Sequence, residues 1–182
     1  TVMPPVLGSQ KGMVLLASMV FLMLLGFLGL SAMESAGQQE KMAGAIRAAN
    51  QSFQGAEAAM HVGETWLQAH WSGMAECASP YRCAPPVEAR SQRSPGLDPQ
   101  SGINWVQTQD GLYGIQFLGL SIPLSQSEKD GSVYLYRITG IGLRGLSRTV
   151  LESVYARHQA VQDGEAGPVR QRFRRVMWRQ IQ

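Results

Sequence analysis

The chain has 182 residues, enough for one domain and an additional anchor. Charged residues make up 16% of it, below the roughly 25% of soluble domains, so an ordinary soluble protein is disfavoured. The net charge of +3 does not indicate a nucleic-acid-binding domain, because five arginines of one C-terminal segment supply the excess. They are Arg170, Arg172, Arg174, Arg175 and Arg179.

The first predicted element is an apolar helix. Residues 13–33 read MVLLASMVFLMLLGFLGLSAM, without a charge or a proline. A bilayer core of about 30 Å requires about 20 apolar residues, so this run can span a membrane. Lys11 before it and Glu34 after it favour a cytoplasmic N-terminus and an exported body. A removable signal peptide is the alternative, but the run is longer than the usual apolar region and offers only a poor cleavage site at Ala32.

The helical pattern continues beyond the apolar run. From Met42 to Leu67, apolar residues recur every three or four positions and polar residues occupy the opposite face. No proline occurs between Gly12 and Pro80, and Gly73 suits a helix stop. We therefore expect one helix over residues 13–72, about 90 Å long.

Residues 74–111 are predicted to be rich in loops, because five prolines interrupt them. Cys77 and Cys83 lie at the start of this region with five residues between them. Outside the cytoplasm such a pair is expected to form a disulfide, while two free thiols or half of a metal site are the alternatives. A bridge this short would fix a loop rather than hold the fold together. Residues 104–106 are predicted to form a short turn or helix.

From Leu112 the hydrophobic period changes to two and predicts strands over residues 113–118, 132–139 and 148–157. Short links, including a glycine-rich loop over residues 140–145, favour antiparallel pairing. We expect one face of this sheet to pack on the helix and the other to stay in water. The predicted class is α+β: a long N-terminal helix, half in the membrane, with a small antiparallel sheet against its outer half.

The tail, residues 169–181, supports two predictions equally. It forms either a fourth strand, with Phe173, Val176 and Trp178 as its apolar contacts, or an exposed basic arm. Its arginines have three possible roles: a solvated or strand-paired terminus, docking to an acidic partner subunit, or binding to nucleic acid or anionic lipid.

No catalytic constellation is recognisable in the sequence. The three histidines are scattered, and Gly140-Ile141-Gly142 follows a predicted strand but opens no helix, as a phosphate-binding loop would. Glu57 and Glu64 share a helical face, where we expect them to be solvated or to pair with a base of a neighbour. We therefore predict a protein that is not an enzyme and that uses no cofactor and no metal.

The segment Lys11-Gly12-Met13, followed directly by the apolar helix, resembles a type III prepilin signal. In proteins with this signal a basic leader ends in glycine, a dedicated membrane peptidase cuts after the glycine, and the new N-terminus is methylated. The resemblance implies a leader over residues 1–12, cleavage between Gly12 and Met13, and methylation of Met13. The helix would then be retained, with a transmembrane half over residues 13–33.

A second segment narrows the resemblance. The outer half of the predicted helix is similar to the N-terminal domain of PilX-type minor pilins of the type IV pilus. The similarity lies in residues 39–44 (QEKMAG), Asn50, Phe53, residues 56–59 (AEAA) and Gly63-Glu64. The resemblance is strong over residues 11–64, weak over the sheet and absent over residues 74–111. It implies a periplasmic half of the helix over residues 34–73, and a periplasmic body over residues 74–182 that holds the loop region, the sheet and the basic tail.

One position departs from most pilins, which carry a glutamate at the fifth mature residue that pairs with the N-terminal amine of a neighbouring subunit. Here that position is Ala17, and the first acid is Glu34. Because an unpaired buried amine is costly, a subunit without this glutamate suits the tip of a filament. The resemblance implies an inner-membrane and pilus protein. Its implied partners are other minor pilins, the major pilin and a large tip adhesin, with the prepilin peptidase as processing enzyme. The alternatives are the tip pseudopilin of a type II secretion system and a single-span anchored periplasmic binding module.

Overall fold

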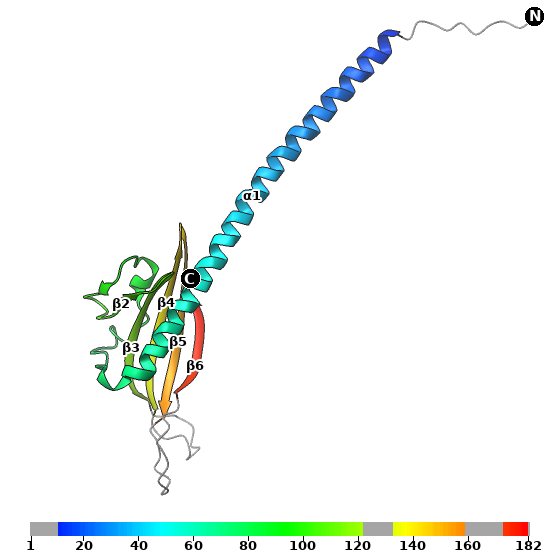
Figure 1. Ribbon diagram of the computed structural model, residues 1–182. Coiled ribbons are helices and arrows are strands. Elements are labelled where there is room, and N and C mark those ends of the chain that lie inside the picture. Colours follow the sequence, from blue (N-terminus) through cyan, green and yellow to red (C-terminus); the bar gives the residue numbers. More distant parts are fainter. Residues whose placement is uncertain (1–10, 122–132, 159–172, 182) are drawn as a thin grey trace, which may run out of the picture. The chain divides into compact units, whose positions relative to one another are not determined.

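The computed structural model describes residues 11–121, 133–158 and 173–181. Within them it contains one long helix, two short 3-10 helices and a six-stranded antiparallel sheet (Figure 1). The chain divides into two compact units, residues 1–45 and 46–182. The predicted α+β class is confirmed. Most of the predicted leader, and Arg170 and Arg172 of the tail, lie outside the described residues.

Helix α1 (Lys11–His70) is unbroken, as the sequence predicted, and the 3-10 helix η1 (Trp71–Gly73) follows it. In the first unit its apolar side chains are exposed, from Met13 at 71% to Met33 at 76%. This stretch is long and apolar enough to cross a membrane, and none of its most apolar window is buried within the protein. An exposed apolar surface of this size is typical of a segment that contacts lipid or another protein.

The strands form a meander in which each strand pairs with the next in antiparallel direction. They are β1 (Gly96–Leu97), β2 (Asn104–Gln107), β3 (Gly111–Ser121), β4 (Val133–Arg144), β5 (Ser147–His158) and β6 (Phe173–Ile181). The three predicted strands are confirmed but are longer than expected. The prediction of a turn or helix over residues 104–106 is wrong, because these residues form β2, which pairs with β3 through Val106 and Tyr113.

The predicted glycine-rich loop over residues 140–145 is also wrong, because β4 continues to Arg144 and only Gly145 and Leu146 form the turn. Gly140 and Gly142 lie in the strand where α1 crosses it. A Cβ added at Gly140 would lie 2.5 Å from the Ala56 carbonyl oxygen, and one at Gly142 would lie 1.8 Å from that of Ser52. The glycines therefore allow close approach of helix and strand, which is a recognised use of glycine within a strand.

Both faces of the sheet are covered, so the prediction of one wet face is wrong. On the helix side, Ala56, Met60 and Leu67 of α1 pack on residues of β4 and β5 such as Ile138 and Leu151. The side chains of alternate strand residues point to the opposite face. There Trp105 and Ile103 pack on Leu112, Ile141 and Val150, together with Ala89 of the 3-10 helix η2 (Val87–Arg90). The loop-rich region therefore folds back as a second layer.

Candidate functional site: the C-terminal strand and its buried carboxylates

The residues of the predicted cleavage site lie at the start of α1. Gly12 and Met13 belong to its first turn and Ala17 to its second, and all three are exposed. The first turn contains no acidic residue. A cut between Gly12 and Met13 would therefore leave almost the whole helix on the mature chain.

The disulfide predicted between Cys77 and Cys83 is present, with the two Cα atoms 5.4 Å apart. The bridged segment is attached to the sheet, because the Cys77 amide donates to the Phe117 carbonyl of β3 at 2.9 Å. At its other end, the backbone carbonyls of residues 82–84 face polar side chains of β3 and β4. The disulfide loop thus ends on a polar site of the sheet.

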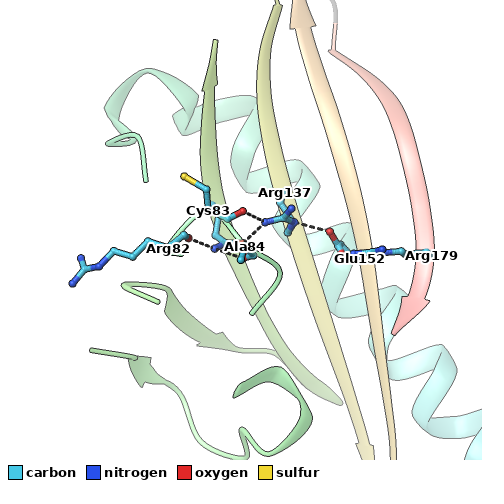
Figure 2. Close-up of polar contacts among 7 residues, drawn as sticks. Arg82, Cys83, Ala84, Arg137, Glu152 and Arg179 are labelled. Carbon is cyan, nitrogen blue, oxygen red and sulfur yellow. Dashed lines mark hydrogen bonds and ion pairs between the residues drawn. The ribbon is translucent and has the colours of Figure 1, made fainter. Parts of the chain in front are cut away.

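Arg137 of β4 is the centre of this polar site (Figure 2). Its Nη1 donates to the Cys83 carbonyl at 2.6 Å and to Gln116 Oε1 at 3.1 Å. Gln116 Nε2 in turn donates to the carbonyls of Arg82 at 2.6 Å and Ala84 at 3.2 Å. Two side chains therefore hold three successive carbonyls of the loop.

Glu152 of β5 completes the network and has no exposed surface. Arg137 Nε donates to its Oε1 at 2.6 Å, and Arg179 Nε of β6 donates to its Oε2 at 2.9 Å. The Nη2 atom of Arg179 lies 2.8 Å from the same oxygen in an ion pair. Figure 2 shows the two arginines approaching the carboxylate from opposite sides. Because a buried carboxylate is tolerated only when it is paired and hydrogen-bonded, Glu152 fixes the positions of both arginines. The network links the disulfide loop to β6 through β4 and β5.

A second buried carboxylate anchors β6 on the helix side of the sheet. Glu64 of α1 is buried and pairs with Arg175 of β6, whose Nε also donates to the Tyr155 hydroxyl at 2.9 Å. Burial, together with the neighbouring Glu64, raises the pKa of Tyr155 to about 12, so its hydroxyl stays protonated at neutral pH. His61 Nδ1 lies 3.3 Å from the other oxygen of Glu64. Glu64 thus pairs with a base of the same chain, whereas Glu57 is exposed.

The described part of the tail is therefore a strand and not a free arm. Phe173 packs on the core of the helix side, and Trp178 meets Phe53 edge to face with ring centroids 6.3 Å apart. Val176, predicted as an apolar contact, is 53% exposed, because it is the extra residue of a bulge between the pairs Tyr155–Arg175 and Val154–Met177. Arg174 is exposed and forms no ion pair within the described ranges.

Sequence reasoning missed Glu152, Arg137 and Gln116, although one signal was available. Each is a polar residue within a run of apolar and aromatic residues that predicts a strand. In an antiparallel meander such residues can come together on one face, but their partners depend on the register. For metal binding, the ranges that the structure describes hold no group of three His, Cys, Asp or Glu side chains.

Comparisons of the chain with protein-family models, with curated proteins and with solved structures give no match. Its function therefore has to be inferred from its own residues and their geometry.

The contacts of the disulfide loop lead to a prediction for the Cys77→Ser/Cys83→Ser double variant. Its free energy of unfolding is expected to fall by about 2 kcal/mol, the chain-entropy value for so short a loop. The Cys83 carbonyl of the loop accepts from Arg137, which is linked to Arg179 of β6 through Glu152. We therefore also expect faster amide exchange in β6, measured by hydrogen–deuterium exchange of the full chain in detergent. Dithiothreitol should reproduce both effects in the wild-type protein and add nothing in the variant. Unchanged exchange in β6 would contradict a link from the loop to this strand.

Proposed function

We propose that this chain is a minor pilin-like subunit that helps to initiate assembly of a type IV pilus. In this proposal α1 anchors it in the bacterial inner membrane with the N-terminus in the cytoplasm and the sheet in the periplasm. The helix then moves from the bilayer into the helical bundle of a filament, while the sheet makes lateral contacts. Other minor pilins, the major pilin and a large tip adhesin are its proposed partners.

The unbroken helix α1 is the observation that supports this proposal most. It begins at the prepilin-like Lys11-Gly12-Met13 segment, runs through the apolar stretch, and continues into the half that packs on the sheet. Cleavage after Gly12 would leave the apolar anchor and the half of the helix that packs on the sheet in one continuous helix. Cleavage near Ala32 by a conventional signal peptidase would instead cut within this continuous helix.

The proposed position in the filament is supported by Ala17. A subunit without a carboxylate there cannot pair with the amine of the next subunit, and this favours a place at or near the tip. The tip pseudopilin of a type II secretion system shares this feature and is the second candidate. Gold-labelled antibody that decorates sheared pili evenly along their length would contradict the tip position.

The first test is the N-terminal sequence of the mature protein from cells with and without the prepilin peptidase. We expect a methylated Met13 as the first residue when the peptidase is present, and an uncleaved leader when it is absent. A Gly12→Leu variant should stay uncleaved in both strains, whereas the matched Gly26→Leu variant, within the helix, should be processed normally. A mature start near residue 33, or the same start in both strains, would exclude a pilin-like protein.

A further inference from the structure

Strand β6 forms one edge of the sheet. It pairs with β5 on one side, and its other backbone edge pairs with no strand within the described residues. An edge strand of this kind offers unpaired amide and carbonyl groups to any extended segment. Beyond the bulge at Val176, the register is regular over Met177–Ile181, which face residues 150–154 of β5. This regular run is long enough to accept a further short strand.

A groove of about 620 Å³ lies beside this run. One wall is formed by residues 84–87 and Arg90 of the loop region, and the other by residues 179–181 of β6. Its volume is in the range of about 300–1,000 Å³ that is usual for ligand sites. The groove contains no acidic residue, and its charged residues are Arg90, which is exposed, and Arg179, which is half-exposed. Glu152 neutralises only one charge of the Arg137–Arg179 pair, so the groove remains positive.

The opposite side of the same edge carries an exposed aromatic ring. Trp178, which pairs with Ser153, is 43% exposed there, next to the exposed Gln180. A strand added along Met177–Ile181 would present alternate side chains to the two sides. Acidic residues at every second position would face the arginines, and apolar residues between them would face Trp178. A second copy of the chain is a poor occupant, because pairing two β6 strands would place arginines against arginines.

We propose that the edge Met177–Ile181 and the adjacent groove bind an extended segment of a partner protein that alternates acidic and apolar residues, and that this segment adds to the sheet as a seventh strand. Backbone hydrogen bonds would provide affinity, and Arg90 and Arg179 would select the acidic residues. This inference rests on the proposed function only in that the chain acts through protein partners. The ion pair with Glu152 fixes the Arg179 guanidinium before a partner binds, so less side-chain entropy is lost on binding.

The test uses the full chain in neutral detergent and a fluorescent ten-residue peptide of alternating glutamate and valine, with binding followed by anisotropy. We expect this peptide to bind and the lysine–valine peptide not to bind. N-methylation of every second amide provides the control for strand pairing, since only alternate amides of a strand point to one neighbour. Methylation in one phase should abolish binding and methylation in the other should be tolerated.

Variants of the protein test the recognition by arginine. Arg90→Glu is expected to weaken binding at least about tenfold, because it places a like charge in the groove. Arg47→Glu makes the same charge change on the exposed face of α1 and should change affinity less than about twofold. Equal effects of the two variants, or tolerance of N-methylation in both phases, would overturn the proposal in favour of general anion binding. Processing at Met13 is measured separately, so failure of peptide binding does not bear on the pilin-like assignment.

Discussion

Replacing Glu152 with alanine is expected to lower the free energy of unfolding by about 3–5 kcal/mol, the usual cost of removing one partner from a buried ion pair. The carboxylate has no exposed surface, and the Arg137 side chain is only 11% exposed. Without Glu152, the Arg137 charge would remain in the protein with only carbonyl and amide oxygens as partners. Arg179, which is 49% exposed, can turn to water and contributes less of the loss.

Urea unfolding of the full chain in detergent, followed by tryptophan fluorescence, measures this effect. Glu57→Ala is the matched control, because Glu57 is an exposed glutamate, and it should change stability by no more than about 0.5 kcal/mol. The triple variant Arg137→Met/Glu152→Leu/Arg179→Leu should recover only part of the loss. It removes the buried charges together, but the Cys83 carbonyl and Gln116 Oε1 lose their donor. A Glu152→Ala protein as stable as the Glu57→Ala protein would show that the network does not stabilise the fold.

Features that depend on nearby residues were predictable from the sequence. The helix follows from an apolar run and a three-to-four-residue stripe without proline, and α1 extends as far as expected, to within a few residues of Gly73. The disulfide joins cysteines only six positions apart, so no distant part of the fold decides whether they meet. The strands from Tyr113, Val133 and Arg148 onward each carry a period of two that is visible without their partners.

Features that depend on distant pairing were not predictable. Whether the tail is a strand depends on two distant carboxylates. Glu64 lies 111 positions before its partner Arg175, and Glu152 lies 27 positions before its partner Arg179. The tail sequence itself fits a basic arm equally well. The second layer over the sheet was missed for the same reason, because a proline-rich segment gives no periodic pattern to show that Ile103 and Trp105 are buried.

Glycine was the most misleading residue in the prediction of β4. From the sequence, Gly140 and Gly142 predict a loop, because glycine most often marks turns. The glycines instead lie where α1 crosses the strand, and the reason for them is visible only once the helix is placed. Of the glycines in that predicted loop, Gly145 does form a turn, with a φ of +59°.

The close approach of α1 to β4 predicts a second large loss of stability, in the variant Gly142→Ala. The added methyl group would lie 1.8 Å from the Ser52 carbonyl oxygen and 2.4 Å from the Ala56 amide nitrogen. Both atoms belong to the backbone of α1, so no side chain can rotate away to relieve the overlap. The helix would have to move, which would stretch the buried hydrogen bond of 2.8 Å between the hydroxyls of Ser52 and Thr149. We expect a loss of about 3 kcal/mol, at the upper end of the range for overpacked cores.

Gly44→Ala is the matched control for this variant. It makes the same chemical change in α1 at a position where an added Cβ meets nothing within 4 Å, so it should leave stability unchanged or raise it by up to about 1 kcal/mol through helix propensity. Thermal unfolding by circular dichroism compares the two variants. Because the loss arises at the contact of α1 with the sheet, Gly142→Ala should also speed amide exchange in the helix from Ile46 onward. Equal stability of the two variants would mean that helix and strand do not approach as closely as the two glycines indicate.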